Sequence, residues 1–298
     1  MRTKEDRRFQ IIGNTVMILL TIAALFPMIL LLISSLTDND TLIRNGYSIF
    51  PEKWSLEGYS YVFATGNSVI NAYGISVILT LIGTSLSLIV TTLLGYALSK
   101  KKLPLRGIMT FYVFFTMLFN GGLAPTYINY AVRFGFKNTF WGLLIPNLVT
   151  NGFYILLMKS YFTTSVPEEI LEAAYIDGAN EFATFFKVAL PLGKPIIVTI
   201  GMFAGIAYWN DWMNGYIYIT TKTELYSIQN LLNRMMQNIQ FLTNNGSSVK
   251  DAALGIAKIP SVSVRMSMAV LGILPIIIVY PMIQRNFVKG ITLGGVKG

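Results

Sequence analysis

The sequence predicts an all-α membrane protein with six transmembrane helices. Of its 298 residues, 53% are hydrophobic and only 12% are charged, whereas about 25% of residues are charged in an ordinary soluble domain. Several apolar segments reach or exceed the roughly 20 residues that a helix needs to cross a bilayer. The basic residues stand beside these segments, which is typical of a membrane protein whose charged loops set its orientation.

The first two spans are expected in the N-terminal third. Residues 2–8 are rich in charge, so residues 1–10 are expected in the cytoplasm, and residues 11–36 are almost continuously apolar. The apolar region of a signal peptide is shorter, about 7–15 residues, so we interpret 11–36 as a retained span. Residues 37–67 are polar and contain Gly and Pro, which favours an irregular outer loop. Its aromatic residues, expected to pack at the membrane surface, are Trp54, Tyr59, Tyr61 and Phe63. The second span covers residues 69–98.

Four further spans are expected at residues 108–130, 141–157, 195–212 and 264–282. The third is interrupted by Asn120-Gly121-Gly122 and Pro125, so we expect it to bend or to end within the membrane. The fifth carries Gly201 and Gly205, and this spacing permits close packing against another helix.

Two polar segments complete the organisation. Residues 214–263 form the longest polar region and are expected to be an extracytoplasmic loop. Within it, apolar residues recur at helical spacing over 227–241, which predicts a helix outside the membrane plane. Residues 289–298 form a glycine-containing tail that is expected in the cytoplasm.

The orientation follows from the basic residues. With six spans and both termini inside, 14 of the 23 Lys and Arg residues fall on the inner side and 9 on the outer side. The inner ones cluster at span ends, as at Lys100-Lys101-Lys102, where the positive-inside rule applies. The net charge of +9 is therefore attributed to membrane orientation, and no nucleic-acid partner is expected.

The composition excludes most catalytic chemistry. The chain has no Cys and no His, so thiolate nucleophiles, histidine bases and the commonest zinc sites are absent. It also contains no Gly-x-x-x-x-Gly-Lys-Ser/Thr sequence, which means that it has no phosphate-binding loop of that kind. We expect no catalytic residue and no metal site, and any ATP hydrolysis must belong to another polypeptide.

A polar segment at residues 165–191 lies between apolar segments on the predicted cytoplasmic side. Ser165 can cap a helix, Pro167 suits its first turn, and Glu168 and Glu169 favour its positive end. Gly178 can supply a left-handed stop. A second short helix is expected from 180 to 189, because its aromatic residues recur at three- and four-residue spacing.

The same segment carries a longer pattern. Glu172-Ala173-Ala174 is followed after three residues by Gly178, and nine residues further on by Val188, one residue, and Leu190-Pro191. This pattern resembles the signature loop of binding-protein-dependent ABC importer permeases, although isoleucine is commoner at the place of Val188. Residues 209–214 and 280–298 resemble the carbohydrate branch of the family, which includes the smaller maltose permease subunit. The N-terminal third and residues 225–229 resemble Gram-positive permeases for complex oligosaccharides.

The resemblance implies a type I ABC importer (MetI-like) fold over residues 11–288. It implies a permease subunit that passes an oligosaccharide from a solute-binding lipoprotein into the cytoplasm by alternating access. The implied partners are a second homologous permease subunit, a cytoplasmic ATPase dimer that holds ATP and Mg²⁺, and membrane lipid. This chain itself would hold no cofactor. It would be a multi-pass protein of the cell membrane of a Gram-positive bacterium, with both termini in the cytoplasm.

In the family, this loop is the coupling region that docks into a groove on the ATPase. Here Ala173, Ala174 and Ile176 would fill the groove, Glu172 would pair at its edge, and Gly178 would set the angle. The predicted docking residues are Glu172, Ala173, Ala174, Asp177, Gly178, Leu190 and Pro191. Without the long pattern, Glu172 and its neighbours would be interpreted as an ordinary solvated surface helix.

A sugar route needs hydrogen-bonding partners and aromatic faces in a water-filled cavity. The candidate residues are Asn120, Tyr127, Asn147, Asn151, Tyr208, Trp209, Asn210 and Asp211. Each has a competing interpretation, because aromatic residues near span ends anchor proteins at the interface and buried Asn joins helices. The resemblance also implies that the partner subunit makes most sugar contacts.

Three other functions stay open at this stage: a permease for peptides or lipids, a non-transporting membrane scaffold, and an ion-coupled carrier. A scaffold would need neither the interrupted third span nor the docking loop. A carrier would need ionisable residues within its spans, and the predicted spans contain almost none.

Overall fold

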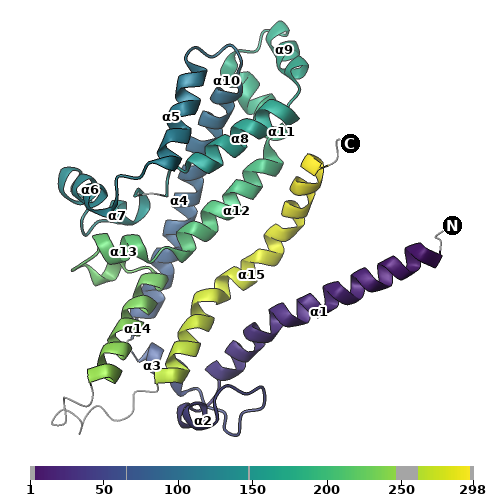
Figure 1. The fold of residues 1–298 in the computed structure, drawn as a ribbon. Helices are drawn as coiled ribbons and strands as arrows, with labels where there is room; N and C mark the ends of the chain where they lie inside the picture. Colours follow the sequence, from purple (N-terminus) through teal and green to yellow (C-terminus); the bar gives the residue numbers. More distant parts are fainter. Residues whose placement is uncertain (1–3, 65, 147, 246–260, 296–298) are drawn as a thin grey trace. The chain divides into compact units, whose positions relative to one another are not determined.

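The computed structural model describes residues 4–64, 66–146, 148–245 and 261–295. Its regular structure in these ranges is helical, apart from one isolated bridge between Thr37 and Trp54 (Figure 1). The prediction of an all-α protein is therefore confirmed. The chain divides into two compact units: unit 1 comprises residues 1–69 and 232–275, and unit 2 comprises residues 70–231 and 276–298.

Unit 1 contains α1 (Lys4–Ser35), α2 (Asn39–Asn45) and α3 (Glu57–Phe63), and it shares α14 (Ile228–Asn245) and α15 (Ser261–Gly295) with unit 2. Helix α1 covers the predicted first span, and its stretch from Phe9 to Ser35 is long and apolar enough to cross a membrane. Its apolar side chains, such as Leu19 and Ile22, are mostly exposed in the single chain. This surface is suited to lipid or to another membrane protein.

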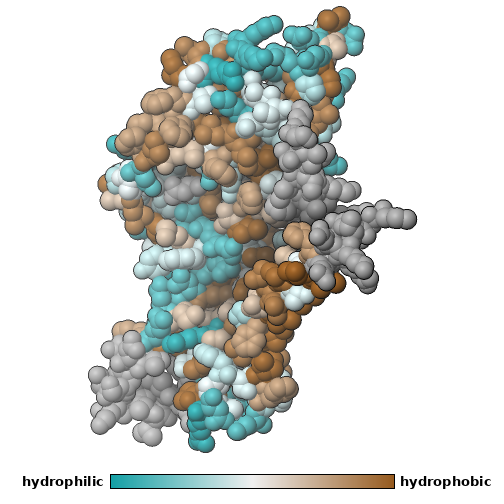
Figure 2. Space-filling model, turned by 45° about the vertical axis from the view of Figure 1, so that its right-hand side comes forward, coloured by the Kyte–Doolittle hydropathy of each residue, from teal (hydrophilic) through white to brown (hydrophobic). Residues whose placement is uncertain are grey.

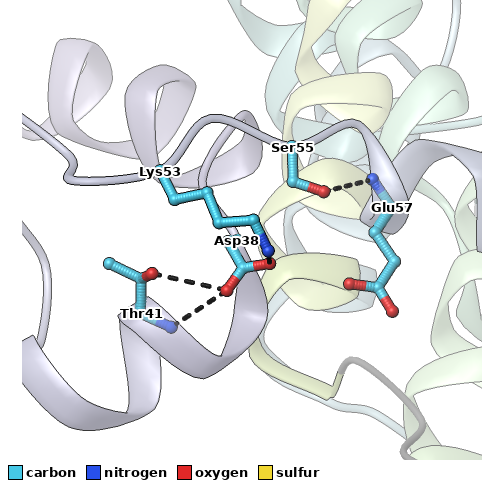
Figure 3. A network of polar contacts seen from close by, with 5 residues as sticks. All are labelled: Asp38, Thr41, Lys53, Ser55 and Glu57. Atoms are coloured by element: carbon cyan, nitrogen blue, oxygen red, sulfur yellow. Dashed lines mark hydrogen bonds and ion pairs between the residues drawn. The ribbon is translucent and has the colours of Figure 1, made fainter.

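The outer loop is more ordered than the sequence predicted. Instead of an irregular segment, residues 37–67 contain α2 and α3, and backbone amides at the start of each helix donate hydrogen bonds to polar side chains (Figure 3). The Asp38 carboxylate accepts a hydrogen bond from the Thr41 amide at 3.3 Å and forms an ion pair with Lys53 at 2.9 Å. The Ser55 hydroxyl accepts the Glu57 amide at 3.1 Å. The hydrogen bond from Lys53 holds the pKa of Asp38 below its ordinary value. Short capped helices carry too few apolar residues for periodicity to reveal them.

Helix α3 packs closely against the first turns of α15. A Cβ at Gly58 would lie 2.5 Å from the Ser267 hydroxyl and 2.7 Å from the Ser263 carbonyl oxygen. The Asn39 side chain accepts hydrogen bonds from the Val262 amide at 3.0 Å and the Ser263 amide at 3.4 Å. Asn39 thus accepts two of the backbone N–H groups that have no partner within α15 at its start, although it lies more than 200 residues away in the sequence.

Unit 2 contains the other described helices, apart from the first two residues of α4. They are α4 (Ser68–Ser99), α5 (Arg106–Leu118), α6 (Leu123–Tyr127), η1 (Ile128–Arg133), α7 (Phe140–Leu144), α8 (Gly152–Ser165), α9 (Glu168–Ile176), α10 (Glu181–Thr184), η2 (Phe185–Ala189), α11 (Leu190–Leu192), α12 (Lys194–Asn210), α13 (Met213–Tyr218) and η3 (Thr223–Leu225). Helix α4 confirms the predicted second span.

The predicted interruption of the third span is confirmed. Helix α5 ends at Leu118, and the segment that follows the break, from Leu123 to Arg133, is bent from it by 114°. Gly122 has a φ of +86°, and its amide donates to the Asn120 side chain at 2.8 Å. A left-handed glycine at this point lets the chain leave the direction of α5 without strain.

The prediction of the fourth span was wrong. Residues 141–157 do not form one helix, because α7 ends at Leu144 and α8 begins only at Gly152. Pro146 lies in the break, and the Asn151 side chain caps α8 by accepting the amides of Phe153 and Tyr154. Helix α8, with 14 residues, is about 21 Å long, which is less than the hydrocarbon core of about 30 Å.

The remaining predicted helices are confirmed, but α15 runs well past the predicted end of the sixth span at residue 282 and includes most of the predicted tail, up to Gly295. Helix α12 covers the fifth span up to Asn210, α15 contains the sixth, and α14 covers the helix predicted at 227–241. By length and composition, three described helices can cross a membrane, and the number rises to five if each bent pair is one span.

Helix α12 packs tightly on α4, as the spacing of Gly201 and Gly205 predicted. A Cβ at Gly201 would lie 3.2 Å from the Leu88 side chain, and one at Gly205 would lie 3.5 Å from the Thr84 hydroxyl. On the α4 side, a Cβ at Gly83 would lie only 2.4 Å from the ring of Tyr208. Small residues on both helices therefore allow the two backbones to approach.

Candidate functional site

Helix α9 is the first part of the predicted docking loop, and it begins later than predicted. Ser165 is the last residue of α8, and the N-cap position of α9 is Pro167 without a side-chain cap. Val166 has an extended backbone and is buried, as expected for a residue that precedes proline. The chain therefore breaks at Val166, and Glu168 and Glu169 occupy the first turn of α9.

Gly178 ends α9 with a φ of +84°, as predicted. Its amide donates to the Tyr175 carbonyl at 3.0 Å, and the Ala179 amide donates to the Ala174 carbonyl at 2.9 Å. This pair of bonds is a Schellman motif, in which a left-handed residue after the helix satisfies its last carbonyl groups. A Cβ at Gly178 would have no neighbour within 4 Å, so glycine is required here by backbone conformation and not by crowding.

The second helical stretch runs further than predicted. The Asn180 side chain caps it by accepting the Ala183 amide at 2.8 Å, and the chain then passes through α10, the π-helical η2 and α11 up to Leu192. Pro191 does not terminate the stretch, because it occupies the start of α11, where a backbone N–H is not needed.

One face of the loop is built into the core of unit 2. Leu171, Phe185 and Ala189 are buried in a cluster with Tyr96 and Phe162. Tyr96 lies 5.6 Å from Phe162 and 4.9 Å from Phe185, measured between ring centroids. The loop is thus packed directly on the end of α4 and on α8.

A polar network ties the loop to the residues that follow α4. The Lys100 ammonium donates to the Tyr175 hydroxyl at 3.0 Å and lies 3.5 Å from the Glu181 carboxylate. The Tyr175 hydroxyl also donates to Glu181. Burial raises the pKa of Glu181, but the Tyr175 hydrogen bond and the Lys100 charge outweigh it, so the pKa lies below its ordinary value. Lys100 therefore holds α9 and α10 to the end of α4.

A second ion pair joins the start of α9 to the same segment. The Lys101 ammonium lies 2.6 Å from the Glu168 carboxylate, and this hydrogen bond lowers the pKa of Glu168 and raises that of Lys101. Both side chains are more than half exposed, so this pair contributes little stability. The Lys101–Glu168 ion pair instead fixes the position of the first turn of α9 relative to the residues after α4.

The outer surface of the loop exposes several large apolar side chains. Ile176 is 86% exposed, Phe182 75% and Phe186 57%. Figure 2 shows hydrophilic residues together with separate hydrophobic ones at the end of unit 2 that carries α9, at the top of the view. Exposed apolar groups of this size on a polar surface are typical of a protein interface.

The predicted docking residues divide into two groups. The exposed ones are Glu172, Ala173, Asp177, Gly178 and Pro191, and the half-buried ones are Ala174 and Leu190. Leu190 packs against the buried cluster of Phe185 and Ala189. Sequence reasoning did not place Phe182 and Phe186 on the docking surface. Their four-residue spacing, opposite the buried Phe185 and Ala189, was the signal that could have found them.

Three of the predicted substrate residues form hydrogen bonds within unit 2, although the buried Oδ2 of Asp211 has no partner among the described residues. The Tyr208 hydroxyl donates to the Leu144 carbonyl at 3.0 Å, in a buried position. Asp211 accepts the amides of Met213 and Asn214. Asn151 is the cap of α8.

Of the other predicted substrate residues that the structure describes, three are exposed or half-buried, and Trp209 is buried. Asn120 and Asn210 are exposed, and Tyr127 is half-buried with its ring stacked 6.2 Å from that of Tyr218. Trp209 is buried, with its ring 6.2 Å from that of Tyr73. Asn147 lies outside the described residues. Among the described residues, no three metal-ligating side chains come together.

Comparisons with known proteins agree with the loop pattern. Residues 94–293 match the family described as binding-protein-dependent transport system inner membrane component. The chain is 31% identical to Protein LplC of Bacillus subtilis, over 92% of this chain and 90% of that protein. It is 30% identical to the polygalacturonan/rhamnogalacturonan transport system permease protein YtcP of the same species, over 99% of this chain and 100% of YtcP.

A solved structure has the same fold. A chain in the crystal structure of a bacterial ABC transporter involved in the import of the acidic polysaccharide alginate superposes with a TM-score of 0.77. It is 28% identical, and the match covers 96% of this chain and 99% of that one.

Proposed function

Because the chain belongs to the family of binding-protein-dependent transport system inner membrane components, we propose that it is the permease subunit of an ATP-driven oligosaccharide importer. The observation that carries the proposal is the loop from α9 to α11. Its inner face is packed in the core, Lys100 ties it to α4, and its outer face exposes Ile176, Phe182 and Phe186. Such a loop can receive force from a partner and pass it to a membrane helix.

The partner on this surface is proposed to be the cytoplasmic ATPase dimer, which would hold ATP and Mg²⁺ and perform all hydrolysis. An exposed apolar tip such as Ile176 gains free energy when a groove covers it. Closure of the ATPases around ATP would then move α9, and the Lys100, Tyr175 and Glu181 contacts would transmit the movement to α4. ATP would favour one of two conformations by binding it more tightly, which is the basis of alternating access.

The other partners are proposed from family membership and from charge. A second, homologous permease subunit would complete the pathway, and the segment 214–263 would face a sugar-binding lipoprotein outside the cell. Both termini would be cytoplasmic, with the tail 289–298 near the ATPase. The Bacillus relatives support a Gram-positive cell membrane as the location.

The cargo is proposed to be an oligosaccharide, because YtcP is named for polygalacturonan and rhamnogalacturonan transport and the solved relative for alginate import. Of the predicted route residues, Asn120, Tyr127 and Asn210 have side-chain surface available for a sugar. The buried Tyr208 and the capping Asp211 would instead shape the walls of the route. A permease for peptides or lipids is the alternative within the import class.

The docking surface is tested with Ile176→Asp in the full chain, purified from its native membrane with everything that stays bound. A carboxylate at this tip would have to be desolvated in an apolar groove, which is costly. We expect at least a tenfold loss of the co-purified ATPase chain and of sugar uptake, with the second permease subunit retained. Mass spectrometry quantifies the subunits, and uptake is measured with labelled neutral oligosaccharides, uronic-acid oligosaccharides and a peptide.

Thr163→Asp is the matched control, because Thr163 is exposed on α8 and lies outside the apolar surface of the loop. It should retain the ATPase. Full ATPase retention by Ile176→Asp would contradict the docking role. Uptake of the peptide but of neither sugar would contradict the cargo class while leaving the docking role intact.

A further inference from the structure

Helices α5 and α8 of unit 2 border a groove of about 490 Å³. The two helices run antiparallel, since Gly152 at the start of α8 lies against Met117 near the end of α5, and Lys159 donates to the Thr110 hydroxyl at 3.2 Å. Arg106 and Lys159 therefore lie toward one end of the groove, and the apolar side chains of Phe114 and Leu156 lie toward the other.

Within the part of the chain that the structure describes, the two cations at the charged end have no anionic partner. Their neighbours Lys100 and Lys101 are paired with Glu181 and Glu168. Among the described residues, no carboxylate lies within ion-pair distance of Arg106 or Lys159. Arg106 uses its Nε to donate to the Leu98 carbonyl at 2.8 Å, which leaves its terminal N–H groups for another acceptor.

The floor of the groove is open at Gly107. A Cβ built there would have no neighbour within 4 Å, so this residue leaves space beside Arg106. Along α5, Phe114 lies eight residues beyond Arg106, or about 12 Å. The groove thus changes from cationic to apolar over the depth at which a phospholipid changes from headgroup to acyl chain.

We propose that this groove binds an anionic glycerophospholipid of the cytoplasmic leaflet. Arg106 and Lys159 bind its phosphate, and one acyl chain lies along Phe114 and Leu156. Basic pockets between membrane helices on the cytoplasmic side recognise anionic headgroups by this combination of charges. Free phosphate would leave the apolar half unused. The proposal concerns lipid bound to this chain and does not depend on the identity of the cargo.

The test is native mass spectrometry of the purified chain with its bound subunits, titrated with phosphatidylglycerol or with phosphatidylcholine of equal chain length. Wild type should retain phosphatidylglycerol in preference to phosphatidylcholine. Each cation contributes about fivefold in affinity, so the R106Q/K159Q variant should bind phosphatidylglycerol about 25-fold more weakly. The control K102Q/K194Q removes the same charge from two exposed sites outside the groove and should bind as wild type does.

A second variant separates loss of binding from loss of folding. Gly107→Leu keeps both cations and fills the groove with a side chain that meets no protein atom at its Cβ. It should also lose the bound lipid while keeping the wild-type unfolding temperature. Equal retention of phosphatidylglycerol by wild type and R106Q/K159Q would overturn the proposal. So would displacement of the lipid by millimolar inorganic phosphate, which would assign a simple anion site. Loss of a protein subunit with lipid retention unchanged would assign the groove to an acidic segment of that subunit.

Discussion

The backbone at Gly178 must both end α9 and turn the chain into the next helix. Its φ of +84° ends α9, and the chain then turns directly into the Asn180 cap of the next helix. An L-residue in this left-handed conformation costs about 1–2 kcal/mol. Within unit 2, a Cβ at this position would meet no atom within 4 Å. Substitutions at Gly178 can therefore separate backbone strain from steric exclusion by a partner.

Gly178→Val should reduce uptake severalfold while the protein stays in the membrane, because a β-branched residue strongly resists a positive φ. Gly178→Asn should retain much more activity, since asparagine tolerates this conformation. Uptake is measured against the amount of membrane protein found by immunoblot. Equal loss in both variants would show that the side chain collides with a partner and that strain is not the cause. Normal uptake by Gly178→Val would contradict any role for the bend.

At the scale of elements, two glycines of α4 have different surroundings, and only one of them lies in the contact with α12. Gly83 faces the ring of Tyr208, and the Tyr208 hydroxyl is held by the Leu144 carbonyl, so the ring cannot move away easily. Gly74 is on the same helix, but a Cβ there would meet nothing within 4 Å. The same substitution at these two positions of one helix should therefore have different effects on stability.

Gly83→Ala should lower the free energy of unfolding by about 1–3 kcal/mol, because it overpacks a filled site. Gly74→Ala should leave stability unchanged or raise it by up to about 1 kcal/mol, because alanine favours helix. Thermal unfolding of the purified protein in detergent, followed by tryptophan fluorescence, gives both midpoints. A Gly83→Ala midpoint equal to that of Gly74→Ala would contradict the packing of Tyr208 against α4.

At the scale of the whole molecule, the distribution of charge sets the orientation in the membrane. The inner Lys and Arg residues are concentrated next to span ends, and the outer ones are spread over longer loops. The docking loop follows Lys159 and is therefore expected on the cytoplasmic side. The natural chain has no cysteine, which allows orientation to be measured with single introduced thiols.

Glu52→Cys and Lys102→Cys replace exposed charged residues on the predicted outer and inner sides. A maleimide that cannot cross membranes should label the first in intact cells. It should label the second only after the membrane is permeabilised. The natural chain should not be labelled under either condition. The reverse pattern would place the docking loop outside the cell and remove the basis for an ATPase partner there.

The sequence alone determined the helical class, the apolar segments and the signature loop, because these depend on residues that are near one another in the chain. Long apolar runs located α1, α4 and α12, helical spacing located α14, and the fixed spacing from Glu172 to Pro191 indicated the family. Local reasoning failed at residues 141–157, where hydrophobicity alone gave no weight to Pro146 or to the cap at Asn151.

Only the tertiary structure decided which polar groups meet. Lys100 and Tyr175 are 75 residues apart, and Arg106 and Lys159 belong to helices that the sequence does not place side by side. The same holds for Tyr208, which had been expected on the sugar route but whose hydroxyl is held by the Leu144 carbonyl. The physical reason is that such contacts depend on how helices pack, and packing depends on the shapes of side chains from distant parts of the chain.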